Sequence, residues 1–197
     1  MRVLRCILLI SSVAGLLHAE PKVLEETKVV EELLAVYRDS DDPEVKEAAL
    51  YKAIEKLKEQ KKYKEVVEKA RWFLGGDSGM RPSAMNKAHV NLHLAQSYDQ
   101  LVMRDEAITA YSEVWTIYKG QIRVSAPALK SWMQLLWERN EPAKGEAMSD
   151  RDCAIQGGHD YIQQLAPFES KMTQKDRAAW LQLDALVKRY KAEVGKE

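Results

Sequence analysis

The sequence predicts an all-α protein built from antiparallel helical hairpins, and three observations lead to this fold class. Apolar residues recur at helical spacing through most of the chain after residue 20. No stretch shows the sustained alternation of apolar and polar residues that is typical of half-buried strands. Clusters of turn-forming residues are few, and they separate segments of helical length.

The first 19 residues have the layout of a secretory signal peptide. Arg2 and Arg5 precede an apolar run from Cys6 to Leu17, and Ala19 is followed by the charged Glu20. The run has twelve residues, whereas a membrane-spanning helix needs about 20. We therefore expect cleavage after Ala19, no stable membrane insertion, and a single helical domain of residues 20–197. A Gram-negative periplasm is the expected location, with secretion as the alternative.

The mature chain would carry 28 basic and 30 acidic residues, a net charge of about −2. This balance offers no electrostatic attraction to nucleic acid or to an anionic membrane, so neither is an expected partner. Only Cys153 would remain, which excludes an internal disulfide. We expect a lone buried thiol there, with an intermolecular bridge as the alternative.

The first half of the mature chain divides into a leading helix and one hairpin. Lys22 to Arg38 has an apolar stripe, and Asp42 followed by Pro43 is typical of a helix start. The hairpin is expected at about 43–74. The side chains expected to face inward are Leu50, Ala53, Ile54, Leu57, Tyr63, Val66, Ala70 and Phe73. A loop containing Gly75-Gly76-Asp77-Ser78-Gly79 follows.

A second hairpin, at about 84–120, shows the clearest pattern. Leu94, Ala95 and Tyr98 share one side of its first helix, and Ala107, Tyr111 and Val114 share one side of its second. The bend lies between Gln100 and Asp105. Two short helices with facing apolar stripes and a tight connection pack as an antiparallel pair.

Ala88 to Gln121 resembles a tetratricopeptide repeat. Leu94-Ala95, Tyr98, Ala107 and Tyr111 stand at the Leu-Gly, Tyr, Ala and second aromatic positions of the family signature. Asn91 and Lys119 replace its first aromatic residue and its proline. A weaker copy lies around Glu47–Leu74, where Tyr63-Lys64-Glu65-Val66-Val67 opens the second helix and Ile54 occupies a position of small residues. The resemblance implies a right-handed stack of about three hairpins, a TPR-like α-solenoid, with extra terminal helices.

The pattern loses register after Gln121. We expect a third hairpin at about 125–156, with Ser125 and Pro127 starting its first helix and Asn140-Glu141-Pro142 ending it. Ala143, Ala147 and Met148 suggest the return helix, which Gly157-Gly158 would terminate. Ile162–Ala166 is expected to form at most a short helix. Thr173 and Asp176 resemble a capping box that opens a last helix at about 173–194.

Two candidate reactive groups have simpler explanations. His89 and His93 lie one helical turn apart, which is metal-ligand spacing, but a zinc site needs a third ligand that the neighbouring sequence does not supply. In the alternative interpretation, His89 lines the inner face of the repeat and His93 lies at its edge. Cys153 with Gly157-Gly158-His159-Asp160 lacks the activating surroundings of a catalytic thiol. We expect no catalytic residue, no metal and no cofactor.

The resemblance implies a non-catalytic scaffold that binds a protein or peptide in a concave groove. The family lines this groove with five positions of each first helix. They correspond here to Ala48, Tyr51, Glu55, Lys58 and Glu59 in the weaker copy and to His89, Leu92, Gln96, Asp99 and Gln100 in the central repeat. There are two alternatives to this scaffold function. The chain could be a metal-dependent enzyme that uses the His89/His93 helix, or a purely structural subunit of an envelope complex. Coverage of this face by the terminal helices is the alternative to an open groove.

Overall fold

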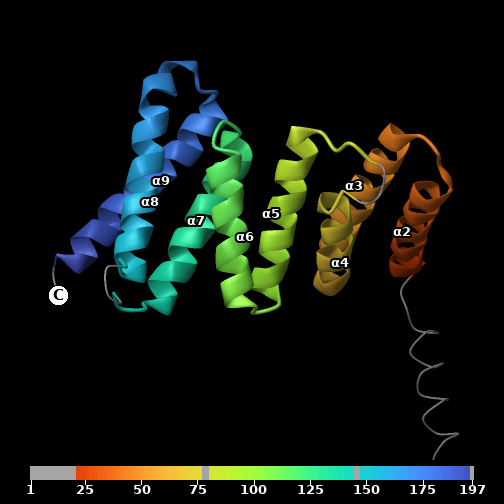
Figure 1. The fold of residues 1–197 in the computed structure, drawn as a ribbon, viewed down its shortest axis with the longest axis horizontal. Coiled ribbons are helices and arrows are strands. Elements are labelled where there is room, and N and C mark those ends of the chain that lie inside the picture. The colour runs from red at the N-terminus through yellow and green to blue at the C-terminus, as the bar shows by residue number, and fades with distance from the viewer. Residues whose placement is uncertain (1–20, 77–79, 144–146, 196–197) are drawn as a thin grey trace, which may run out of the picture.

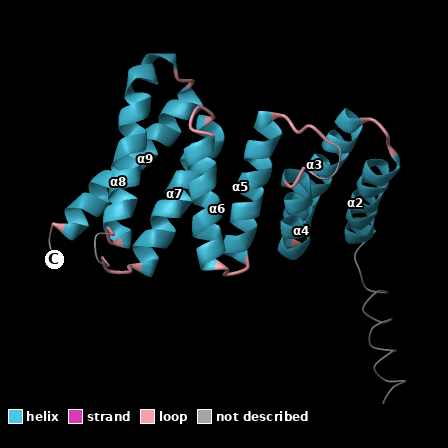
Figure 2. Cartoon of the chain, in the orientation of Figure 1, coloured by secondary structure: helices cyan, strands magenta, loops and turns pink. Residues whose placement is uncertain are grey.

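The computed structural model describes residues 21–76, 80–143 and 147–195, in which helices are joined by short loops and turns (Figures 1 and 2). The proposed signal segment lies outside these ranges. The described chain contains eight α-helices and one short 3₁₀ helix, which confirms the all-α fold class. In order they are α2 (Pro21–Asp39), α3 (Pro43–Glu59), α4 (Tyr63–Leu74), α5 (Ala84–Gln100), α6 (Arg104–Ile117), α7 (Ile122–Arg139), α8 (Asp150–Leu165), η1 (Ala166–Lys171) and α9 (Gln174–Val194).

Side-chain caps define where several helices begin. The Asp42 carboxylate accepts hydrogen bonds from the backbone amides of Glu44 and Val45, and Pro43 is the first residue of α3. Thr173 caps α9 in the same manner by accepting from the Asp176 amide. Each cap supplies a partner for a backbone amide that has none within its helix. Both starts match the expectation from the sequence.

Each helix packs mainly against its neighbour in the sequence, so the chain advances from α2 to α9 across the molecule (Figure 1). A second set of contacts links alternate helices. The odd-numbered helices meet in order, α3 with α5, α5 with α7 and α7 with α9. They therefore form a continuous row, against which the even-numbered helices pack.

The core consists of two clusters that meet in the middle of the molecule. One lies among the helices from α2 to α7, and the other lies among α7, α8 and α9. Ile108, Trp115 and Trp132 pack against both clusters. The Trp115 and Trp132 rings lie 5.4 Å apart between centroids, a distance typical of favourable aromatic pairs. These side chains connect the two clusters.

The third hairpin differs from the expected one. Helix α7 begins at Ile122 and includes Pro127 in its second turn. A proline there has no amide hydrogen to donate within the helix, and its neighbours Ala126 and Ala128 are buried in the core. The return helix begins at Asp150, capped by Ser149, rather than near Ala143.

The sequence predicts that Gly157 and Gly158 terminate a helix, and this prediction is wrong. Both glycines lie inside α8. A Cβ on Gly157 would lie 2.7 Å from the Trp132 ring. A Cβ on Gly158 would lie 2.5 Å from Val187 and 2.9 Å from Met133. The glycines therefore permit a close approach of α8 to α7 and α9, and α8 continues to Leu165 where only a short helix was expected.

No helix in the described ranges combines the length and the apolar character that crossing a bilayer requires. The expectation for the first 19 residues stays a prediction.

Candidate functional site

The candidate site is the surface formed by α3 and α5, which we name the α3/α5 face. The two helices contact each other although a hairpin bend and a loop separate them in sequence. Of the ten residues that correspond to groove positions, all but one are half-buried or exposed. The half-buried ones are Tyr51, Glu55, Lys58, His89, Gln96 and Asp99, and the exposed ones are Ala48, Glu59 and Gln100.

Leu92 is the exception. Its side chain is 8% exposed and packs in the core cluster with Leu94 and Ala95. The expected aliphatic anchor is therefore a core residue, and Tyr51 is the main apolar group that the predicted set offers at the surface.

A hydrogen bond between Lys58 and His93 joins the two helices. The Lys58 ammonium donates to Nδ1 of His93 across 2.9 Å. His93 is therefore held against α3 rather than at the edge of the repeat. Because Nδ1 accepts this bond, the neutral ring carries its proton on Nε2.

The pKa of His93 is lowered to about 4, mainly by burial and also by the neighbouring Lys58 and His89, while a hydrogen bond with Gln96 opposes the shift. Burial also lowers the pKa of Lys58, against an opposing effect of the Glu55 carboxylate. Above the lowered pKa of His93 the ring is neutral and Lys58 is its hydrogen-bond donor. The pair therefore sets a fixed polar contact in the α3/α5 face.

Glu55 organises the neighbouring part of α3. Burial, together with the hydrogen bond from the Tyr51 hydroxyl to the Glu55 carboxylate and the charge of that carboxylate, raises the pKa of Tyr51 to about 12. Glu55 thus interacts with Tyr51 on one side and Lys58 on the other. Residues 48, 51, 55 and 58 share one side of a helix because their spacings are three and four.

Asp99 connects the face to the next hairpin. It hydrogen-bonds the Tyr111 hydroxyl, which is also bonded to Ser131 on α7. Burial raises the pKa of Asp99, the nearby Glu138 carboxylate raises it further, and the Tyr111 bond opposes the shift. The carboxylate is therefore built into a network across α5, α6 and α7.

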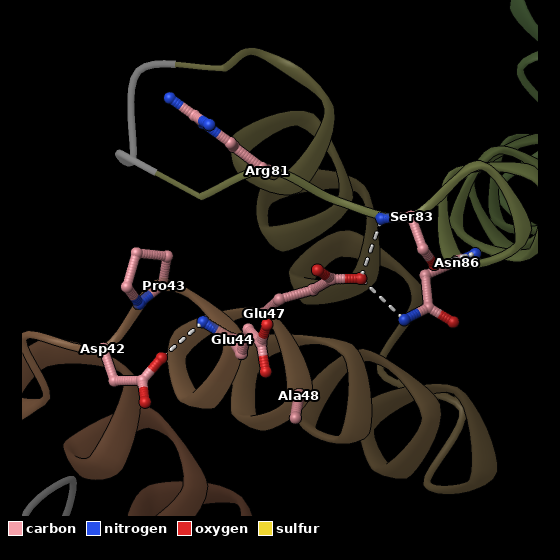
Figure 3. Close-up of a pocket in the computed structure, with 8 residues that line it drawn as sticks. All are labelled: Asp42, Pro43, Glu44, Glu47, Ala48, Arg81, Ser83 and Asn86. Carbon is pink, nitrogen blue, oxygen red and sulfur yellow. Dashed lines mark hydrogen bonds between the residues drawn. The ribbon is translucent and has the colours of Figure 1, made fainter.

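An open cleft of about 960 Å³ lies at the N-terminal ends of α3 and α5 (Figure 3). Glu47 stands between the helices and accepts from the Ser83 amide at 3.0 Å and from the Asn86 side chain at 2.7 Å. The lining of the cleft also includes Asp42, Glu44, Ala48 and Arg81. Ala48 belongs to the predicted groove set, so the cleft continues the α3/α5 face at one end.

Glu47, Asn86 and His93 also contribute to this surface, and none of them is among the residues that the sequence predicts there. Their roles depend on contacts between residues separated by 35 or more positions. Local periodicity carries no signal for such contacts. The acidic residues around the Asp42-Pro43 helix start were the one available hint of the cleft.

The histidine pair does not have the surroundings of a metal site. The His89 and His93 rings lie 6.5 Å apart between centroids. Within the described ranges, no group of three His, Cys, Asp or Glu side chains is arranged to hold a metal ion. The Lys58 ammonium occupies Nδ1 of His93, and its positive charge would oppose a cation there.

Cys153 is partly exposed, in contrast to the expected buried thiol. Burial and the carboxylates of Asp150 and Asp152 raise its pKa, with Arg139 opposing them. A catalytic thiol needs the opposite shift, because its thiolate is the nucleophile. His159 lies six residues further along α8, on a different side of the helix.

Comparison of the chain with models of protein families, with curated proteins and with solved structures found no match. The resemblance to tetratricopeptide repeats therefore stays an expectation from the residues of Ala88–Gln121 and Glu47–Leu74, and the structure shows an all-helical chain whose helices pack mainly with their sequential neighbours.

Proposed function

We propose that the chain is a TPR-like helical repeat protein that binds a protein or peptide partner on its α3/α5 face and performs no catalysis. The observation that carries the proposal is the row of odd-numbered helices, α3, α5, α7 and α9. In a stack of helical hairpins, such a row of first helices presents one extended surface for a partner. The right-handed solenoid geometry is part of the proposal.

The charges of the face favour a partner with basic groups. Carboxylates come from Glu55, Glu59 and Asp99 and, in the adjoining cleft, from Asp42, Glu44 and Glu47. Lys58 and Arg81 are the cations of the same sets, and Lys58 already contacts His93. Complementary charge raises the association rate and selects the partner more than it raises affinity.

Polar and half-buried side chains around one aromatic group suit an extended peptide or a loop. Such a surface orients its partner by hydrogen bonds and retains bridging water. We propose that this binding takes place after export, in the periplasm of a Gram-negative cell, and that it requires no cofactor.

Site-specific photo-crosslinking in the native cell tests the proposal. A photoreactive residue at Glu59 or Gln100, both exposed on the face, should capture one defined partner. The same residue at Gln163, exposed on the even-numbered helix α8, is the matched control. Capture from all three positions would instead favour a structural subunit surrounded by an envelope complex.

Crosslinking of a variant with added positive charge on the face gives the second measurement. Glu59→Lys combined with Gln100→Lys should reduce capture at a neighbouring face position, and the melting temperature should remain within a few degrees because both side chains are exposed. Undiminished capture by this folded variant would place the partner elsewhere on the molecule.

A further inference from the structure

Side-chain hydrogen bonds join α3 to α5 at two places along the α3/α5 face. Near the start of both helices, the Glu47 carboxylate accepts from the Asn86 amide at 2.7 Å. Further along both helices, the Lys58 ammonium donates to Nδ1 of His93 at 2.9 Å. These bonds hold the two helices of the face in a fixed relation to each other.

The second of these bonds exists only while His93 is neutral. An ammonium group has donors and no acceptor, so Nδ1 of His93 must offer a lone pair to Lys58. A proton on Nδ1 would place two donors and two positive charges against each other at hydrogen-bond distance. Protonation of the ring therefore breaks the bond, whatever the pH at which it occurs.

The charged and titratable groups around His93 come from α3 and from α5 itself. Lys58 lies on α3 with the Glu55 carboxylate nearby, and His89 and Gln96 lie on α5. The other helices that pack against α5 direct such groups at different residues of it. Arg71 of α4 donates to Tyr98, Tyr111 of α6 bonds Asp99, and Glu138 of α7 acts on Asp99. Lys58 is thus the cation that a proton on His93 meets.

Loss of the bond changes the charge of the α3/α5 face. The Glu55 carboxylate already attracts the Lys58 ammonium along α3. Once released from His93, the ammonium lies closer to Glu55 and offsets one of the carboxylates of the face. The charged ring of His93 adds a further positive charge beside it. Both changes weaken the attraction to a partner with basic groups.

We propose that the Lys58–His93 bond is a pH-sensitive link in the α3/α5 face: acid breaks it, turns Lys58 toward Glu55 and weakens the hold on the partner. The effect on the partner rests on the proposed function, whereas the breaking of the bond does not. The link is reversible, since only a proton is gained and lost.

An NMR titration of the purified protein tests the link without a partner. The His93 ring should carry its proton on Nε2 at neutral pH and gain the second with a pKa of about 4. The signals of the Lys58 side chain next to its ammonium should shift in the same step. Lys58→Met removes the cation, so its His93 should be half protonated at a pH at least about 0.5 higher. Lys52→Met, an exposed lysine on the same helix, is the matched control and should change nothing.

His93 titrating at the same pH in the wild type and Lys58→Met overturns the proposal, as do Lys58 signals that do not follow the ring. The Lys58→Met comparison looks for a rise toward neutral pH, so it decides the matter even where strong acid unfolds the wild type.

Capture of the partner tests the regulatory effect. The yield from a photoreactive residue at Glu59 should fall at least about threefold from pH 7 to about pH 4, and it should fall less in His93→Gln, which has no ring to protonate. Equal falls in the two proteins overturn the regulatory effect. Absence of capture at every pH contradicts the proposed function instead, and the NMR titration still decides whether the link exists.

Discussion

At the scale of single residues, His93 shows how burial converts a titratable group into a fixed neutral one. It stands against Lys58, whose ammonium donates to its Nδ1 atom. Protonation would place two cations in contact within a half-buried site. The folded state therefore excludes a proton that the unfolded chain accepts.

This exclusion predicts a pH dependence of stability. The pKa of His93 falls from 6.5 to about 4 on folding. The unfolded chain binds the proton first as pH falls, so the free energy of unfolding should decrease from pH 6.5 downward and level off below pH 4. The upper limit of this loss is about 3 kcal/mol. Urea unfolding at a series of pH values measures it.

His93→Gln keeps an acceptor for Lys58 and removes the titration, so its stability curve should be flatter in that window. His89→Gln is the control and should retain most of the slope. Equal slopes in the wild type and His93→Gln would assign the effect to other groups.

Gly158 gives a second prediction at this scale. Within an unobstructed helix, Gly→Ala stabilises by up to about 1 kcal/mol. Here the added Cβ would lie 2.5 Å from Cγ2 of Val187, on the neighbouring helix α9. Gly158→Ala should therefore destabilise the protein by about 1–3 kcal/mol. Denaturant unfolding compares it with Gly120→Ala, whose Cβ meets nothing within 4 Å. A more stable Gly158→Ala protein would contradict the close approach of α8 and α9.

At the scale of elements, Arg139 and Asp150 join the end of α7 to the start of α8. Two nitrogens of the Arg139 guanidinium donate to the two Asp150 carboxylate oxygens, at 2.7 and 2.8 Å. Asp150 is 7% exposed and also accepts from the Glu141 amide. The pair joins the chain before residues 144–146 to the chain after them. Residues 144–146 themselves lie outside the described ranges.

Removing the arginine should be costly because a buried carboxylate would lose its main cation. Arg139→Leu should lower the free energy of unfolding by about 2–4 kcal/mol. Arg104→Leu is the matched control, since its pair with Glu138 spans 3.9 Å between side chains that are both more than half exposed. Its loss should cost at most about 1 kcal/mol. Similar losses in the two variants, measured by denaturant unfolding, would contradict a structural role for the Arg139–Asp150 pair.

At the scale of the whole molecule, the order of helix contacts determines which surfaces exist. The row of odd-numbered helices forms one side and carries the proposed partner-binding face. Because Trp115 and Trp132 pack against both core clusters, the helices of this row belong to one connected structure.

Export is a prediction about the whole chain. If residues 1–19 act as a signal peptide, the protein recovered from its native compartment should begin at or near Glu20. Mass spectrometry of the N-terminal peptide measures this. Recovery of a membrane-bound product that retains Met1 would contradict both cleavage and the proposed periplasmic location.

The sequence alone determined the all-α class and the starts of α3 and α9. These features depend on residues close together in the chain, such as the Asp42-Pro43 cap and the Thr173–Asp176 cap. The apolar repeat likewise identified Leu50, Ala53, Ile54 and Leu57 as core residues, and all four are fully buried. Local capping and helical periodicity are encoded within a few turns, so they can be read without knowledge of the neighbours.

Tertiary structure alone decided what covers each helix. Gly157-Gly158 has the composition of a helix end, but contacts with Trp132, Met133 and Val187 place it inside α8. Leu92 occupies a groove position of the resembled family, yet neighbouring helices bury it. His93 became part of the α3/α5 face because Lys58, 35 residues away, reaches it. Such outcomes depend on which distant residues meet, and the spacing of residues within one helix does not contain that information.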